Sequence, residues 1–418
     1  MSEKEYPVYG YRWVVLAVFM LVNLTIQTLW ISYAPVTNSA AQFYGVGDLE
    51  IGILAMSFMI AFIPFSIPAS WVIDTYGFRL GVGIGVVLMA VGGIIRGLAG
   101  ANYTLVLIGT IAIAIAQPFL LNAWTKVPAN WFSVQERATA VGLVTLGNLV
   151  GTAIGMVLTP ILHETLDIPT IQLIYGIVTA ISSVLFLVFS REKPVTPPCP
   201  PEMEVRVLMF DGLKHALRTR MFWYILLVSF IGLGIFNGIN TWIEGIVRLR
   251  GFASTDAGTL GAIMLVGGVL GAVIIPPFSD KQRKRRRYLL LGIILSVPGL
   301  VGLTFATPFW LLAVSAFVLG FFLVSTLPIG IQYAAEITYP TPEGTSNGLI
   351  QLFGQASVVF VFIMSVLKTP DDSFTPSLLL ALVLLVICAV VTTQLRDPQD
   401  VPPTQQVESV ASIRAESS

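Results

Sequence analysis

Residues 12–36 have the sequence RWVVLAVFMLVNLTIQTLWISYAPV, and an apolar stretch of this length predicts a helix that crosses a membrane. Asn23, Gln27 and Trp30 are spaced i, i+4 and i+7, so they lie on one face of that helix. Polar groups that face lipid are costly. We therefore expect this face to point into a helical bundle, where Gln27 and Trp30 line a central binding site. The alternative is that Trp30 belongs to an aromatic belt at the membrane surface.

The composition of the whole chain agrees with a membrane protein. Of its 418 residues, 55% are hydrophobic and only 11% are charged, whereas soluble domains have about 25% charged residues. The formal net charge is zero, so no overall field favours nucleic acid. The two cysteines, Cys199 and Cys388, give neither a disulfide framework nor a metal motif. We expect no cofactor, no metal and no nucleic-acid partner.

Apolar segments of about 20 residues recur along the chain and match the thickness of a bilayer. They predict an all-α polytopic fold with twelve transmembrane helices. The domain layout expected from them is an N-terminal cytoplasmic tail (1–11), a six-helix bundle (12–190), a linker (191–219), a second six-helix bundle (220–395) and a disordered tail (396–418). The spans are placed near 12–36, 49–73, 80–100, 103–125, 138–162, 169–190, 221–246, 257–278, 288–306, 309–333, 345–367 and 376–395, with a short surface helix expected after Pro201.

Basic residues predict how the chain is oriented in the membrane. The connections on one side carry Arg79, Lys126, the linker cations and the run 281–287 (KQRKRRR), whereas the other side has few. Cytoplasmic loops are the ones enriched in Lys and Arg, so both termini are expected in the cytoplasm. Arg96 lies near the end of the third span, from which its side chain is expected to reach outward to water.

The two halves of the chain are related by an internal repeat with an offset of 206 residues. This offset places Asp74 on Asp280 and Arg79 on Arg285. Parallel repeats of six spans are typical of transporters that alternate between two states. The same offset places Trp30 on Phe236, so two aromatic residues occupy equivalent positions in spans one and seven.

Span seven carries a second polar stripe, formed by Asn237, Asn240 and Glu244. Gly238 lies within it and is expected to break the helix, as in helices that line a cavity. Gln117 in span four and Gln355 in span eleven are further candidates for the site. For a single amide at membrane depth the alternative is a hydrogen bond between helices, worth on average about 0.6 kcal/mol.

Residues 68–81, PASWVIDTYGFRLG, resemble the loop signature of the major facilitator superfamily between spans two and three. The second copy keeps the acid and the base, as Asp280 and Arg285. The resemblance implies a gating role for Asp74, Arg79, Asp280 and Arg285, whose contacts would form and break as two halves rock around a central site.

Three longer segments are similar to the feline leukaemia virus subgroup C receptor-related family of transporters. They are GVGDLEIGILAMSFMIAFIPFSIPASWVIDTYGFRL (45–80), LGNLVGTAIGMVLTP (146–160) and AAEITYPTPEGTSNGL (334–349). Members of this family move choline and ethanolamine, and haem export has been ascribed to it. The resemblance implies an aromatic box for a quaternary ammonium ion, built from Trp30, Gln117, Phe236 and Gln355.

Two positions of span seven depart from that family. Asn237 stands where the family has a tyrosine, which removes one wall of the box, and Glu244 stands where a neutral amide is usual. The carboxylate of Glu244 either attracts a cationic substrate or pairs with Arg248, four residues on.

The function expected from these patterns is alternating-access transport of a small organic solute by a monomer, not enzymatic catalysis. An amine or quaternary ammonium ion such as choline or ethanolamine is the expected substrate. The N-terminal spans contain no acid or histidine at membrane depth, so facilitated diffusion is expected. The alternatives are a proton-coupled exporter of hydrophobic cations, with Glu244 as the proton site, and a carrier of organic anions.

Overall fold

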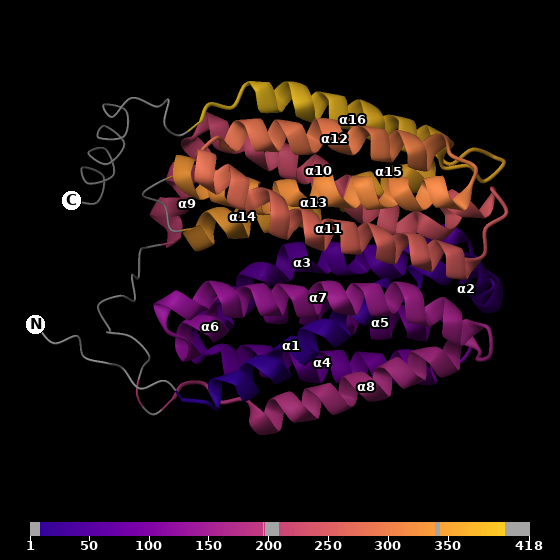
Figure 1. The fold of residues 1–418 in the computed structure, drawn as a ribbon. Helices are drawn as coiled ribbons and strands as arrows, with labels where there is room; N and C mark the ends of the chain where they lie inside the picture. Colours follow the sequence, from indigo (N-terminus) through magenta and orange to yellow (C-terminus); the bar gives the residue numbers. More distant parts are fainter. Residues whose placement is uncertain (1–8, 195, 197–208, 339–342, 398–418) are drawn as a thin grey trace, which may run out of the picture. The chain divides into compact units, whose positions relative to one another are not determined.

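The computed structural model describes residues 9–194, 196, 209–338 and 343–397, and the regular elements among them are all helices (Figure 1). Twelve helical segments in this part of the chain are long and apolar enough to cross a membrane, which confirms the predicted all-α fold. The predicted short helix after Pro201 is present as α9. Cys199, much of the linker and the ends of both tails lie outside the described residues. The elements are α1 (Arg12–Ile31), η1 (Ala34–Val36), α2 (Thr37–Tyr44), α3 (Asp48–Tyr76), α4 (Phe78–Leu98), α5 (Tyr103–Leu121), α6 (Lys126–Trp131), α7 (Val134–His163), α8 (Ile168–Phe189), α9 (Met209–Arg218), α10 (Arg220–Arg248), α11 (Ser254–Gln282), α12 (Arg285–Phe305), α13 (Phe309–Ile337), α14 (Glu343–Ala356), α15 (Val358–Val366) and α16 (Thr375–Thr393).

Local signals explain where several helices begin. Asn102 caps α5 by accepting a hydrogen bond from the backbone N–H of Leu105 at 3.2 Å. Asp167 caps α8 by accepting from the N–H of Thr170 at 3.3 Å. Short polar side chains satisfy the free N–H groups at a helix start in this way. The spans therefore begin close to where the polar residues flanking each apolar run predicted them.

The first span is longer than predicted and is not one helix. Helix α1 ends at Ile31, a 3₁₀ turn containing Pro35 follows, and α2 continues to Tyr44. Proline has no N–H to donate to the preceding turn, so it favours an interruption of the helix. Gly45, with φ of 67°, then ends α2 in a left-handed conformation that glycine adopts without strain.

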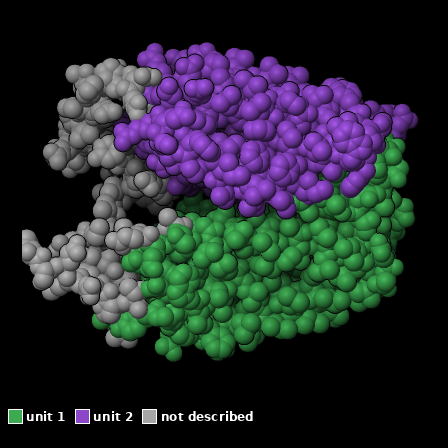
Figure 2. All heavy atoms as spheres, in the orientation of Figure 1, with its two compact units in different colours: residues 1–205, 240–262 green, residues 206–239, 263–418 purple. Residues whose placement is uncertain are grey.

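The chain folds into two compact units, coloured separately in Figure 2. Unit 1 comprises residues 1–205 and 240–262, and unit 2 comprises residues 206–239 and 263–418. In unit 1, α4 packs against α5 and α8, and in unit 2, α12 packs against α13 and α16. These are the same neighbours at equivalent positions of the repeat, as the offset of 206 residues predicts. The predicted division of the spans at the 191–219 linker stays a prediction.

The helix break expected at Gly238 lies instead at Trp242, whose backbone has φ of −105° and ψ of 16°. Trp242 is the repeat equivalent of Val36, which has a similar conformation (φ −126°, ψ 28°) between η1 and α2. Both copies therefore interrupt their first span at the same position. Gly238 has a different use, because a Cβ there would collide with Met364 of α15. The missing side chain makes room for a neighbouring helix and does not break its own.

Glycines of α7 allow α1 to approach closely. A Cβ added at Gly151 would collide with the backbone of Leu24, whereas a Cβ at Gly142 of the same helix would meet nothing within 4 Å. Transmembrane interfaces use small residues in this way, since close backbone packing supplies much of the association energy.

We expect Gly151→Ala to lower the stability of the protein by about 1–3 kcal/mol, because the added methyl group forces α1 and α7 apart. Gly142→Ala is the matched control and should be neutral or slightly stabilising, since alanine favours the helix. The unfolding midpoint in detergent measures both. Equal midpoints for the two variants would contradict the packing described for Gly151.

Candidate functional site

Trp30 is held inside unit 1 by a hydrogen bond. Its side chain is 8% exposed, and its Nε1 donates to the carbonyl oxygen of Ala55 on α3 at 3.2 Å. A belt tryptophan would present its ring to the membrane surface, so the burial of Trp30 favours the cavity interpretation. The bond to Ala55 fixes the plane of the indole ring.

Two of the predicted amides contact each other, and one of them, Gln27, lies about one turn before this tryptophan on α1. Gln117 of α5 donates from Nε2 to Oε1 of Gln27 at 3.3 Å. The other polar atom of Gln117, Oε1, is buried and accepts no hydrogen bond from any described residue. A buried acceptor without a donor is costly. This oxygen is therefore suited to accept from a hydroxyl or an ammonium group of a bound molecule.

The remaining predicted binding residues are divided between the two units. Phe236 and Asn237 of α10 and Gln355 of α14 lie in unit 2 and are half-buried. Asn240 is fully buried and lies in unit 1. Gln355 precedes by two residues the interruption at Ser357 that separates α14 from α15. A single site that includes both sets of residues stays a prediction.

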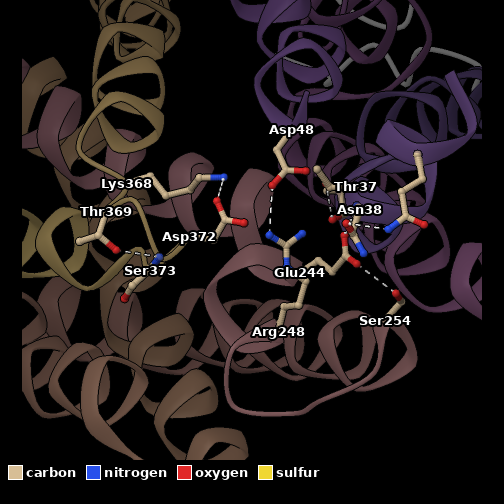
Figure 3. Close-up of polar contacts among 12 residues, drawn as sticks. Thr37, Asn38, Asp48, Glu244, Arg248, Ser254, Lys368, Thr369, Asp372 and Ser373 are labelled. Carbon is tan, nitrogen blue, oxygen red and sulfur yellow. Dashed lines mark hydrogen bonds and ion pairs between the residues drawn. The ribbon is translucent and has the colours of Figure 1, made fainter. Parts of the chain in front are cut away.

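Unit 1 contains a polar cluster that the sequence did not predict, shown in Figure 3. Glu244 accepts a hydrogen bond from the backbone N–H of Asn38 at 2.7 Å and from the hydroxyl of Ser254 at 3.2 Å. Arg248 forms an ion pair with Asp48 at 3.2 Å. The cluster thus joins α2, α3 and the parts of α10 and α11 that belong to unit 1.

Members of this cluster are equivalent to one another in the repeat. Asn38 and Glu244 are 206 residues apart, so the residue and its own counterpart share a hydrogen bond. The same offset pairs Gln42 with Arg248 and Asp48 with Ser254, and Gln42 donates to Asn38 at 3.4 Å. The contact between counterparts identifies this cluster as the place where the two copies of the first span meet within unit 1.

The carboxylate of Glu244 lies at the N-terminus of α2. Helix N-termini present free N–H groups and a partial positive charge, which favour a carboxylate. Glu244 is held by Asn38 and Ser254, and Arg248 forms an ion pair with Asp48. The alternative in which Glu244 also pairs with Arg248 stays a prediction. Glu244 is thus well placed to stabilise the interrupted first span.

Arg96 does not reach outward to water as predicted. Its side chain is 1% exposed and donates to Oε1 of Gln172, to the hydroxyl of Ser32 and to the carbonyl oxygen of Leu29. Its guanidinium carbon also lies 4.6 Å from the centre of the Tyr33 ring. Leu29 is in the last turn of α1, where carbonyl oxygens lack partners and a cation is favourable. The prediction is wrong because these acceptors, distant in sequence, draw the side chain inward.

The predicted gating pair of unit 1 has partners other than each other. Asp74 lies 3.7 Å from Lys126, and the carboxylate of Glu192 accepts from the backbone N–H groups of Phe78 and Arg79 at 3.2 and 2.7 Å. The sequence did not predict a role for Glu192, which follows the sixth span. It caps α4 at the position where the signature loop turns into the helix.

In the equivalent pair of unit 2, the two predicted gating residues contact each other. Arg285 contacts Asp280, and its Nη2 lies 2.8 Å from Glu336 of α13. Asp397, which follows the twelfth span, accepts from the backbone N–H of Arg286 at 2.9 Å. Glu336 and Asp397 were also missed. The repeat could have indicated Glu192 and Asp397, because each is an acid that follows the last span of its half. Glu192 caps α4, and Asp397 caps the equivalent helix α12.

Similarity to known proteins agrees with this architecture. Residues 14–283 and 245–416 match the family model of the Major Facilitator Superfamily. The chain is 30% identical to the zebrafish (Danio rerio) solute carrier family 49 member A3 over 391 residues, which is 90% of this chain and 82% of that protein. It is 26% identical to the zebrafish choline/ethanolamine transporter flvcr2b over 407 residues, 92% of this chain and 84% of that protein.

Solved structures show the same fold at low identity. A bacterial homologue of the human lysosomal transporter Spinster, in an inward-facing and unoccupied conformation, has a TM-score of 0.71 at 15% identity and covers 92% of this chain and 97% of its own. A mutant of the nucleoside transporter NupG has a TM-score of 0.70 at 14% identity, covering 91% of this chain and 99% of its own.

We expect Glu244→Gln to destabilise the protein by roughly 1 kcal/mol, because the charge that interacts with the N-terminus of α2 is lost. Asp167→Asn is the matched control: it also neutralises an acid at a helix N-terminus, but asparagine caps as well as aspartate. Thermal unfolding in detergent measures both. If Glu244→Gln and the control unfold at the same temperature, the carboxylate does not stabilise the interrupted first span.

Proposed function

Because the chain belongs to the Major Facilitator Superfamily, we propose that it carries a small organic amine or quaternary ammonium ion, such as choline or ethanolamine, across a membrane. The chain is a multi-pass membrane transporter and not an enzyme. The observation that carries the proposal is the arrangement of Trp30, Gln27 and Gln117 in unit 1, which combines a fixed aromatic ring with a buried, unpartnered acceptor.

The chemistry of these groups suits a hydroxylated or amine-bearing cation. A cation over an indole ring gains about 0.5–2 kcal/mol, and more when it is desolvated. The hydrogen bond from Trp30 to Ala55 restricts the ring before substrate binds, which lowers the entropic cost of binding. Oε1 of Gln117 would accept from the hydroxyl of choline or the ammonium of ethanolamine. Relatives named as choline/ethanolamine transporters support the same substrate class.

The second half would contribute the other side of the site. Phe236 would supply a second ring, and Asn237, Asn240 and Gln355 would supply amides. Since Asn237 replaces the tyrosine that the resembling family has, fewer rings surround the cation. This difference favours ethanolamine, whose ammonium donates hydrogen bonds, over a fully methylated headgroup that depends on aromatic walls alone.

The buried charges of the spans support facilitated diffusion. A proton-coupled carrier needs a group that changes its charge during the cycle. Arg96 and Glu244 are the candidates buried deep within the described spans, and each is engaged with backbone groups of the interrupted first span. We therefore favour transport down the gradient of the substrate, with coupling through Glu244 as the alternative.

The mechanism we propose is alternating access by a monomer with both termini in the cytoplasm. The cytoplasmic gate would be formed at the helix ends that flank the turn after the second span of each half, by Asp74 and Arg79 in one half and by Asp280 and Arg285 in the other. Their present partners, Lys126, Glu192 and Glu336, would exchange or keep these contacts as the gate opens. Asp48 and Arg248 would contribute to the opposite gate.

We expect Trp30→Ala to raise the half-saturating concentration for choline or ethanolamine counterflow in proteoliposomes by about 2–30-fold, the factor that corresponds to one cation–ring contact. Trp30→Phe should recover part of the loss because it keeps a ring. Trp71→Ala, which removes an exposed tryptophan of α3, is the matched control and should leave counterflow unchanged. Saturable counterflow of neither amine by the unmodified protein would contradict the proposed substrate.

We expect uptake of the substrate to be insensitive to a pH gradient imposed across the proteoliposome at constant membrane potential. Glu244→Gln should keep this insensitivity, since the carboxylate serves the backbone of α2 and does not carry a proton through the cycle. Accumulation that follows the pH gradient in the unmodified protein and disappears in Glu244→Gln would establish the proton-coupled alternative.

A further inference from the structure

The turn between α11 and α12 is the most basic part of the described chain. Six cations lie between positions 281 and 287, and we call this segment the basic turn. Only Arg285 is buried, and it is engaged with Asp280 and Glu336. Asp397, the third acid nearby, accepts from the backbone of Arg286. The side chains that are exposed to solvent and have no acidic partner among the described residues are Lys281, Arg283, Lys284 and Arg287.

Comparison with the first copy of the repeat shows that these cations are additions. At the positions equivalent to the four exposed cations, the turn of unit 1 has the uncharged residues Thr75, Gly77, Phe78 and Gly81. The one cation of that turn is Arg79, whose counterpart is Arg285. The turn geometry and the gating residues therefore need just one arginine. The cytoplasmic bias in Lys and Arg accounts for the sign of the four exposed cations of the basic turn, but neither the turn geometry nor the gating residues account for their number.

Arg283 is the clearest of these additions. Its backbone φ is 51°, in the left-handed region that residues other than glycine rarely adopt. Its counterpart Gly77 has φ of 95°. An arginine at a position where glycine is unstrained costs folding free energy. A side chain kept at such a cost points to an interaction of the guanidinium group outside the fold.

The surfaces of both helices indicate where these cations lie. Ile274 and Phe278 of α11 are exposed apolar residues, and Lys281 continues their face at helical spacing. On α12, Leu291 and Ile294 are exposed, and Arg287 lies on the same face one turn earlier. Exposed apolar faces of membrane-spanning helices contact hydrocarbon chains. Both faces end in a cation, and a long basic side chain at the end of a membrane-spanning helix extends toward the lipid headgroups.

We propose that the basic turn binds the anionic headgroups of phospholipids through Lys281, Arg283, Lys284 and Arg287. Guanidinium groups hold phosphate oxygens with paired hydrogen bonds, and lysines add point charge. Basic segments beside membrane spans attract anionic lipids in this way. A soluble anion would profit from the charge but not from the apolar faces that continue from the cations, so the partner is a lipid.

The test is a titration of the purified protein with phosphatidylglycerol in micelles of a neutral detergent. A ligand bound by the folded state raises the unfolding midpoint. Arg283→Gly/Arg287→Gln removes two cations and restores the glycine of the first copy, so the fold should persist. We expect this variant to need about thirtyfold more lipid for half of the full rise, from the usual contribution of two cations near a membrane.

The control is Arg191→Gln/Lys193→Gln, which removes two exposed cations of unit 1 and should titrate like the unmodified protein. Equal losses in both variants would show a diffuse charge effect and overturn the proposal. Inorganic phosphate and glycerol phosphate are added to the same micelles without lipid. A rise in midpoint from these anions that the basic-turn variant loses would also overturn it, because the site would then serve a soluble anion.

If the first variant does not fold, Lys281→Gln/Lys284→Gln removes the other two cations without changing the left-handed position. The same thirtyfold loss is expected of it. An unchanged titration in this variant would contradict the role assigned to the turn.

Discussion

The interrupted first span is the constraint on which the rest of unit 1 depends. Inside a bilayer every backbone N–H and C=O must find a partner, because water is not there to supply one. The gap between α1 and α2 frees carbonyl groups at the end of one helix and N–H groups at the start of the next. Arg96 donates to the carbonyl of Leu29, and Glu244 accepts from the N–H of Asn38. The two buried charges thus match the two ends of the interruption.

Those charges also lie beside the residues that we propose bind the substrate. Trp30 lies next to Leu29 in the last turn of α1, so the side chain that holds Leu29 also limits the movement of the indole ring. Gln27 lies one turn earlier and receives Gln117. A charge engaged with backbone is not free to bind an ion in transit. The attraction for a cationic substrate would then come from the ring and the amides.

The fold could be predicted largely from the sequence, because its signals are local. The length of each apolar run set the twelve spans, and polar residues such as Asn102 and Asp167 set where helices begin. The repeat was equally visible, since Asp74 and Asp280 stand in the same context. The face of Gln27 and Trp30 followed from helical spacing, and their burial agrees with it.

The errors came from residues whose role depends on distant partners. Gly238 has the sequence context of a helix break, but what decides its role is Met364, more than a hundred residues away. The indole ring of Trp242, at the break, has room only because position 52 of α3 is glycine, where a side chain would collide with the ring. No window of neighbouring residues contains these pairs.

The repeat contains part of the information that such windows lack. The first span of each copy is interrupted at an equivalent residue, Val36 in one and Trp242 in the other. The equivalent residues Asn38 and Glu244 share a hydrogen bond. Where a residue contacts its own repeat counterpart, as Asn38 contacts Glu244 in unit 1, the two positions face each other. A polar residue in one copy then constrains what its counterpart can be. Glu244 fits this rule: a carboxylate can accept from the backbone of Asn38, whose N–H is free because the first span is interrupted just before it. The hydrogen bond to Asn38 therefore gives Glu244 a structural role within unit 1 that does not depend on the charge of a substrate.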